Sequence, residues 1–364
     1  MSKPKTVPVA KKIVETARDV HERILKNKSP TMITPVRSLS NVKYQLKTGY
    51  FEMLGRNKQR TLTVSTVKTF AQTLKMMSLA KELIDKSDMA TKREAYYISK
   101  NWGKAGFSEQ AESDTIMDDV EAMFGVNREQ LRFTPEEKGG DVAGRLIVVD
   151  TDAKGKKIRV DCTKFGSGAY SIPTEVEDLQ FQSEAKFVLA IETAGMFQRL
   201  VKYDYWEKSK CILVSMGGVP TRACRRFIRR LTDQLKIPVY AFVDGDPYGY
   251  FNIYRTLKVG SGNAAHMNRF FCVPSVSFLG VTPEDIITYK LPTHPLKEVD
   301  IKRAKDALKN DPFVKHHKPW QKAINQMLNM HVRVEQQAFA KHGLDFVVKK
   351  YLPAKLKDPS EFLP

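Results

Sequence analysis

Three carboxylates follow two apolar runs that are typical of buried strands. Glu192 follows the run 186–191, and Asp244 and Asp246 stand at the end of the run 239–243. Residues two apart in an extended chain point to the same side, roughly 6–7 Å apart at about 3.3 Å rise per residue. Asp244 and Asp246 can therefore face one point, which Glu192 reaches if its strand is adjacent. Three oxygen ligands of this kind favour magnesium over zinc. The alternative is that the two aspartates form a turn and that Glu192 caps a helix.

A pair of tyrosines lies on a predicted helix earlier in the chain. Arg93 and Tyr97 are four residues apart and share a helix face, whereas Tyr96 is rotated about a quarter turn away. A phenol has an ordinary pKa of about 10 and is a poor nucleophile unless a cation stabilises its oxyanion. Arg93 is placed to supply that cation or to hold an attacked phosphate. The alternative is one core tyrosine and one surface tyrosine without a chemical role.

Three predicted helices surround the tyrosine pair. Residues 70–86 have helical spacing, and Thr91 with Glu94 forms a capping box that starts the second helix. The third helix is expected over 113–124, with Gly125 as its C-cap.

A predicted β-hairpin follows these helices. Residues 145–150 and 157–163 alternate like strands around a turn. Three helices and then a hairpin is the order of a winged helix-turn-helix domain. We expect the third helix to expose Asp118, Asp119 and Glu121, which would repel phosphates in a major groove. The domain is therefore not expected to dock on DNA as a transcription factor does.

The second half of the chain alternates buried strands with helices. Strands are expected over 186–191, 211–215 and 239–243, separated by helices over 196–203 and 222–235. This βαβαβ order predicts a parallel sheet with right-handed crossovers, and ligands bind such sheets at the carboxyl ends of their strands.

Composition limits the class of protein. Hydrophobic residues make up 42% of the chain, as expected for a globular protein, and Lys and Arg outnumber Asp and Glu by 60 to 41. The net charge of +19 favours a polyanion as partner. Five arginines within 222–235 indicate either a solvated face or a DNA contact.

The four cysteines form no CxxC pair, which argues against a zinc ribbon or a disulfide framework and favours a reducing cytoplasm. No apolar run is long enough for a membrane span, and no secretory signal or nucleotide-binding glycine loop is recognisable.

In combination these motifs resemble the A subunits of archaeal type IIB topoisomerases (topoisomerase VI) and their relatives, the meiotic double-strand-break proteins. The similar segments are Lys92–Trp102, Ile191-Glu192, Gly217–Thr221, Val243–Gly249, Ile253-Tyr254 and Leu279-Gly280.

The resemblance implies a multi-domain α/β fold. It consists of an N-terminal extension over 1–68, a winged-helix domain with the catalytic tyrosine over 69–178, and a Toprim domain with a parallel sheet and a helical C-terminal part over 179–364. The extension is expected to contain a helix over 9–26 and strand-like runs near 44–53 and 61–67. It is either a packed extension or an arm that docks a partner.

The resemblance also implies a function. Tyr97 would be the nucleophile, Arg93 would lie near the scissile phosphate, and Glu192, Asp244 and Asp246 would bind Mg²⁺. The expected reaction is a transient 5′-phosphotyrosyl break in both strands of double-stranded DNA. The partners would be a second copy of the chain and two ATPase B subunits, in the cytoplasm on the nucleoid and away from membranes.

Three other interpretations stay open from the sequence. One is a Toprim nuclease or primase-like phosphotransferase, in which Tyr97 would be structural. Another is a winged-helix DNA-binding protein without catalysis, in which the carboxylates would be idle. A meiotic-type double-strand-break protein is the alternative within the same family.

Overall fold

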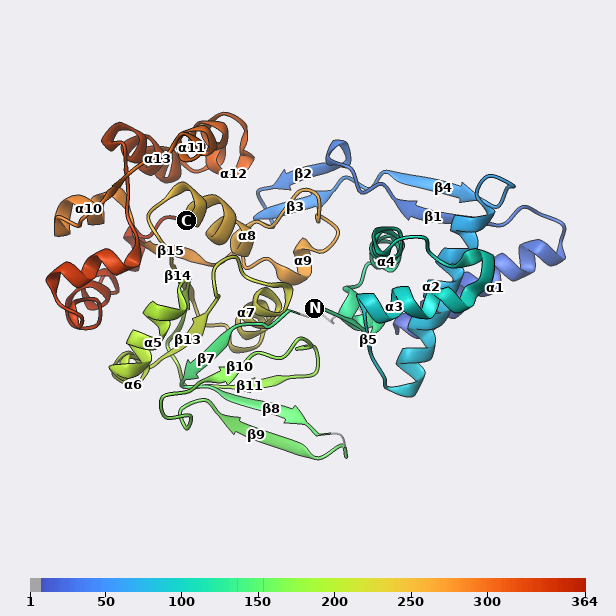
Figure 1. The fold of residues 1–364 in the computed structure, drawn as a ribbon, viewed down its shortest axis with the longest axis horizontal. Helices are drawn as coiled ribbons and strands as arrows, with labels where there is room; N and C mark the ends of the chain where they lie inside the picture. The colour runs from blue at the N-terminus through green and yellow to red at the C-terminus, as the bar shows by residue number, and fades with distance from the viewer. Residues whose placement is uncertain (1–7, 136, 153) are drawn as a thin grey trace. The chain divides into compact units, whose positions relative to one another are not determined.

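The chain forms two compact units, coloured by residue number in Figure 1. The computed structural model describes residues 8–135, 137–152 and 154–364, so the first seven residues of the predicted extension lie outside the described part. Unit 1 comprises Met1–Lys43, Phe51–Glu136 and Ser261–Phe270, and unit 2 comprises Tyr44–Tyr50, Glu137–Gly260 and Phe271–Pro364.

Unit 1 is built on four helices whose apolar sides share one core. They are α1 (Val9–Leu25), α2 (Val67–Lys86), α3 (Lys92–Ile98) and α4 (Gln110–Phe124). Phe70, Ala95 and Val120 are buried in that core. The three predicted central helices, the capping box and the Gly125 C-cap are confirmed, because these signals are local in sequence.

Short strands accompany these helices. In unit 1, β1 (Thr31–Pro35) pairs antiparallel with β4 (Asn57–Thr61). The strand expected over 61–67 is wrong, because β4 ends at Thr61 and α2 begins at Val67. β5 (Ala90–Thr91) and β6 (Phe133–Thr134) also lie in unit 1, whereas β2 (Val42–Gln45) and β3 (Tyr50–Met53) each begin in one unit and end in the other.

The acidic side chains of α4 are not all exposed, which corrects the expectation from sequence. Asp119 and Glu121 are buried, with exposed fractions of 4% and 0%. The Arg37 guanidinium donates to Asp119 at 2.9 Å, and the Arg128 backbone N–H donates to Glu121 at 2.5 Å. Asp118, which is partly exposed, pairs with both arginines. The prediction failed because Arg37 lies far from α4 in sequence and Arg128 lies beyond the end of the helix.

Unit 2 is built on a six-stranded sheet in the order β10-β7-β13-β12-β14-β15. The strands β12 (Phe187–Ile191), β13 (Cys211–Ser215) and β14 (Val239–Phe242) are parallel, as predicted. A further parallel strand that the sequence analysis did not predict, β15 (Ser277–Gly280), lies at the edge of the sheet beside β14. On the other side, β7 (Asp141–Gly144) and the edge strand β10 (Tyr170–Ser171) add antiparallel pairs.

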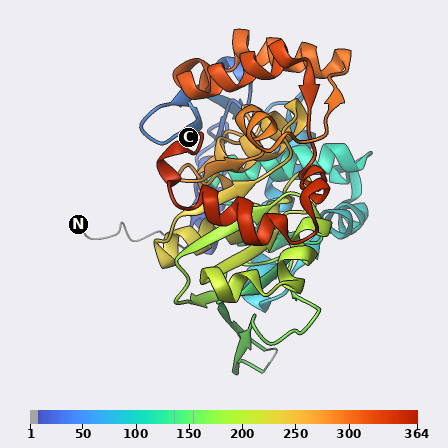
Figure 2. The same cartoon turned by 90° about the vertical axis from the view of Figure 1, so that its left-hand side faces the viewer.

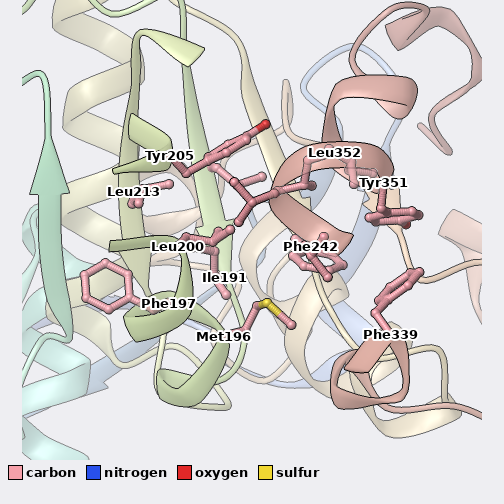
Figure 3. Packing of buried hydrophobic residues seen from close by; sticks show 14 of the residues in the cluster. Ile191, Met196, Phe197, Leu200, Tyr205, Leu213, Phe242, Phe339, Tyr351 and Leu352 are labelled. Carbon is pink, nitrogen blue, oxygen red and sulfur yellow. The ribbon is translucent and has the colours of Figure 1, made fainter. Parts of the chain in front are cut away.

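Helices cover the sheet of unit 2. α5 (Ala194–Lys202) and α6 (Tyr205–Ser209) pack on the face to which Leu189, Ile191 and Leu213 point. Figure 3 shows this core together with Phe242 and Phe339. Side chains of the alternate strand positions, such as Val188, are buried as well, so both faces are covered, as parallel sheets require.

The remaining helices of unit 2 all come after β13 in sequence, and Figure 2 shows the C-terminal ones in orange and red. They are α7 (Arg222–Leu235), which precedes β14, α8 (Arg255–Lys258), α10 (Pro283–Tyr289), α11 (Glu298–Asn310), α12 (Pro312–His316), α13 (Lys318–Met330) and α14 (Leu352–Lys355). The short pair β16 (His294–Pro295) and β17 (Val332–Arg333) flanks α11 to α13 in sequence, and α9 (Asn268–Phe271) spans the boundary between the units.

The predicted hairpin forms, but it does not lie in unit 1 with the three helices. β8 (Ile147–Thr151) and β9 (Lys157–Asp161) belong to unit 2, where β8 also pairs with β11 (Gln180–Gln182). The hairpin signal is local and does not say which sheet a hairpin joins. Ala153 of its turn lies outside the described residues. The domain limits 1–68, 69–178 and 179–364 stay a prediction.

The arginines of α7 make contacts within unit 2. Arg226 forms a two-pronged ion pair with Glu177 at 2.6 and 2.7 Å, and Arg230 donates to the Leu179 carbonyl at 2.6 Å. These bonds connect α7 to the segment that enters β11. They give the basic helix a structural role in the fold.

The buried acid of α4 yields a prediction about stability. Asp119→Ala should lower the free energy of unfolding by about 3 kcal/mol, because it removes the buried carboxylate that pairs with two largely buried arginines, Arg37 and Arg60. Urea unfolding followed by circular dichroism measures this loss. The control is Asp85→Ala, whose carboxylate is 55% exposed and pairs with Lys81 on one helix face. That change should cost at most about 0.5 kcal/mol. Equal small losses in both variants would show that Asp119 is effectively solvated.

Candidate active site

The three predicted metal ligands come from two neighbouring strands. β12 and β14 pair in parallel with Ile191 opposite Phe242, so the residues that follow each strand emerge at the same edge of the sheet. Glu192 directly follows β12, and its Oε2 accepts a hydrogen bond from the Asp244 backbone N–H at 2.8 Å. The adjacency that the sequence argument required is therefore present within unit 2.

Each carboxylate is held through one oxygen by a backbone N–H group. Besides the bond to Glu192, the Gln336 N–H donates to Asp244 Oδ1 at 2.8 Å, and the Gly249 N–H donates to Asp246 Oδ1 at 2.6 Å. This arrangement fixes the direction of every carboxylate. A carboxylate has two oxygens, so each acid keeps a second oxygen beyond this bond, and that of Asp246 (Oδ2) lies 3.8 Å from the Arg333 guanidinium.

Burial and mutual repulsion disfavour the charged forms of these acids. Burial, assisted by the charge of Asp244, raises the pKa of Glu192 to about 8. Burial also raises the pKa of Asp244 to about 6, and the nearby Asp246 charge adds to the shift. The pKa of Asp246 is raised by burial as well. A bound cation would reverse this, because an adjacent positive charge favours ionised carboxylates.

The donor chemistry of this cluster fits magnesium. It consists of hard oxygen atoms, and their unfavourable charging is the condition that a divalent cation relieves. Within the described ranges, no three His, Cys, Asp or Glu side chains are arranged so that together they could hold a metal ion. Magnesium usually keeps several waters and takes few protein ligands, so an open group of carboxylates is compatible with it.

Gly245 stands between the two aspartates because the backbone of another segment approaches closely there. A Cβ at this position would lie 2.6 Å from Val334 Cγ1 and 2.8 Å from the Val281 carbonyl oxygen. The Gly245 N–H donates to the Val334 carbonyl at 2.9 Å. The need for a glycine between the two aspartates thus comes from Val281 and Val334, which lie far from Gly245 in sequence.

Two residues near the carboxylates carried no recognisable signal in the sequence. Arg333 lies with a guanidinium nitrogen 3.8 Å from Asp246 Oδ2, and Gln336 binds Asp244 through its backbone. No motif surrounds either residue, so only the fold reveals them.

The tyrosine pair lies on α3 in unit 1. The Tyr97 side chain is 62% exposed, and Arg93, one helical turn earlier, is exposed as well. Tyr96 is half-buried, and its hydroxyl donates to the Ser108 carbonyl at 3.1 Å. Ala95 is fully buried, away from the face of Arg93 and Tyr97. Of the two hydroxyls, the one on Tyr97 is therefore the accessible one.

The start of α3 is fixed by its cap. The Thr91 hydroxyl accepts from the Glu94 N–H at 3.1 Å, and the Glu94 carboxylate accepts from the Thr91 N–H at 2.6 Å. The cap and the Tyr96 hydrogen bond hold the helix that presents Tyr97.

None of the helices in the described part of the chain has the length and apolarity needed to cross a membrane.

Family comparisons cover most of the chain. Residues 68–133 match the type IIB DNA topoisomerase family, and residues 136–185 match the all-beta domain of the alpha chain of DNA topoisomerase VI. Residues 187–356 match the Toprim domain shared by Spo11 and the A subunits of topoisomerase 6. The Toprim match confirms the fold predicted for the second half of the chain, and the first match agrees with a winged-helix region.

Curated relatives match over nearly their full lengths. The type 2 DNA topoisomerase 6 A subunit of Methanocaldococcus jannaschii is 53% identical over 362 residues, which is 100% of this chain and 98% of the relative. The protein of the same name from Methanothermobacter thermautotrophicus is 37% identical, over 92% of this chain and 93% of its own. The protein of the same name from Haloarcula marismortui is 33% identical, over 98% of this chain and 97% of its own.

The raised pKa of Glu192 yields a prediction about pH. The ordinary pKa of a glutamic acid is about 4.3, so between about pH 4.3 and 8 the folded chain keeps a proton that the unfolded chain releases. This contribution to stability is complete at low pH and is lost as the pH rises through about 8. Without metal, Glu192→Gln should therefore gain melting temperature relative to wild type as the pH rises over this window. Circular dichroism melting in a chelator measures the difference.

The control for this experiment is Glu284→Gln, which changes an exposed carboxylate of the same unit. Its melting temperature should follow that of the wild type at every pH. Parallel curves for Glu192→Gln and wild type would refute the assignment of a buried, uncharged Glu192.

Proposed function

The chain belongs to the family of type IIB DNA topoisomerase A subunits, and we propose that it cuts DNA with Tyr97 while Glu192, Asp244 and Asp246 hold magnesium. The observation that carries this assignment is the contrast within the tyrosine pair. Tyr97 is exposed beside Arg93, whereas the Tyr96 hydroxyl is used in a hydrogen bond to Ser108.

The proposed reaction is a transesterification. The Tyr97 oxygen attacks a backbone phosphorus of DNA, a 5′-phosphotyrosyl bond forms, and the 3′-oxygen leaves and takes up a proton. The Arg93 guanidinium is placed to stabilise the phosphate oxygens as charge builds on them. Magnesium, when bound, would add positive charge at the same phosphate. Reversal of the ester reseals the strand without net hydrolysis.

The proposed assembly follows from the need to cut both strands. Two tyrosines require two copies of the chain, and we propose a homodimer joined by two ATPase B subunits. In this arrangement the tyrosine of one protomer acts beside the carboxylates of the other. The B subunits would supply the ATP hydrolysis that drives duplex passage, for relaxation or decatenation. The proposed place of action is the nucleoid in the cytoplasm.

The tyrosine assignment is tested by two single-hydroxyl changes. Tyr97→Phe should abolish covalent attachment to DNA, because it removes the attacking oxygen, and it should leave the melting temperature nearly unchanged since the side chain is exposed. Tyr96→Phe should keep most of the activity. The measurement is denaturant trapping of the assembled enzyme on supercoiled plasmid with magnesium and ATP. Loss of the adduct in Tyr96→Phe and its retention in Tyr97→Phe would overturn the assignment.

The metal assignment is tested with amide variants that keep the shape and one acceptor oxygen. Asp244→Asn, Asp246→Asn and Glu192→Gln should each reduce cleavage about 100-fold or more, as expected for losing a group that stabilises charge in the transition state. Wild type should gain about 2.7 kcal/mol of stability at a magnesium concentration 100 times the Kd. The variants should lose most of that gain.

Thermal melting with and without magnesium, beside plasmid cleavage, separates the possible roles. Without metal, the variants should melt at or above the wild-type temperature, because clustered carboxylates repel one another. A wild type that magnesium leaves unchanged, together with variants that melt far lower, would show that the carboxylates are structural.

A further inference from the structure

A fully buried glutamine joins the ends of the two strands that carry the carboxylates. Gln336 has an exposed fraction of 0%. Its side-chain Nε2 donates to the Phe242 carbonyl at the end of β14, at 2.8 Å. Its Oε1 accepts from the Thr193 hydroxyl, one residue beyond Glu192, at 2.9 Å. The amide of Gln336 thus binds through its nitrogen at the end of β14 and through its oxygen just beyond the end of β12.

The same residue also contacts the site through its backbone. The Gln336 N–H donates to Asp244 Oδ1 at 2.8 Å. The Phe242 carbonyl that accepts from the glutamine side chain also accepts from the Glu192 N–H, at 3.0 Å. One residue therefore connects the backbone beside Glu192, the end of β14 and the carboxylate of Asp244.

The chain just before Gln336 runs along the Asp-Gly-Asp loop. Val334 exchanges two backbone hydrogen bonds with Gly245, at 2.9 and 3.1 Å. Arg333 approaches Asp246 to 3.8 Å. The segment 333–336 thus contacts all three residues of the loop, and Gln336 is its member that also reaches β12.

We propose that Gln336 is a positioning residue of the carboxylate site, which sets the separation of Glu192 and Asp244 and directs one Asp244 oxygen away from the cation. This inference rests on the proposed magnesium site. A glutamine is suited to the position because its amide offers one donor and one acceptor. Methionine has a similar shape but would leave the Thr193 hydroxyl without its acceptor, and glutamate would add a further acid beside the carboxylates.

The test compares Gln336→Met with Gln337→Met in the full-length chain. Gln337 is the exposed neighbour of Gln336, so it serves as a matched control. Magnesium chloride is titrated against the chain by calorimetry and by thermal melting. Gln336→Met should weaken magnesium binding about 10- to 100-fold, the range typical of residues that orient metal ligands. Gln337→Met should bind magnesium like the wild type.

The magnesium dependence of plasmid cleavage by the assembled enzyme gives a second readout. In Gln336→Met the half-saturating magnesium concentration should rise, and cleavage at saturating magnesium should largely recover. A variant that melts lower but has the wild-type magnesium Kd would overturn the proposal, because the role of Gln336 would then be structural only. A wild type that binds no magnesium would refute the metal site itself.

A milder pair of variants keeps the proposal testable if Gln336→Met fails to fold. Thr193→Val removes the hydroxyl that donates to Gln336 and that accepts from the Met196 N–H at the start of α5, whereas Thr193→Ser keeps both bonds. Thr193→Val should weaken magnesium binding and Thr193→Ser should not. Equal magnesium affinity in the two Thr193 variants would overturn the proposal.

Discussion

The parallel pairing of β12 with β14 is the constraint on which the candidate site depends. Glu192 and Asp244 are far apart in the chain and meet only because Ile191 lies opposite Phe242. That register is strongly specified, because both strands are apolar and covered on both faces. A slip by one residue would turn buried side chains to the wrong face and would separate the carboxylates. The free energy that holds the acids together therefore comes from the hydrophobic core, in which Ile191 and Phe242 both participate (Figure 3).

The site itself opposes folding when it is charged. Burial raises the pKa of Glu192 and Asp244, and each of these acids adds to the repulsion felt by its neighbours. Backbone N–H groups compensate part of this cost, because each carboxylate accepts one. They also fix the carboxylates before any cation arrives, so less ordering remains for the binding step. A functional site that is locally unfavourable and is held by a well-packed surround is a common solution in enzymes.

Sequence reasoning succeeded where the signals were local and failed where distant segments decide the outcome. The α3 capping box, the Gly125 C-cap and the apolar strands were predicted, and the βαβ rule then gave a parallel sheet. The burial of Asp119 was missed, because its partner Arg37 lies 82 residues away. Gln336 was missed for the same reason, since its contacts at Asp244 and Phe242 are 92 and 94 residues distant. A single polar residue without a motif gives no pattern from which burial or partners follow.

The proposed nucleophile in unit 1 and the carboxylates in unit 2 are presented in different ways. The carboxylates are buried and strongly perturbed, whereas Tyr97 lies exposed on a helix fixed by its cap and by the Tyr96 hydrogen bond. A phenol is a poor nucleophile toward phosphate unless a cation stabilises its oxyanion. Under the proposed function, the cations that activate it are Arg93 on its own helix and magnesium held by the other protomer. In that proposal cleavage requires DNA, metal and two protomers together, so an unassembled chain would not break DNA. Placing the nucleophile and the metal ligands on different protomers would then make assembly itself the condition for cutting.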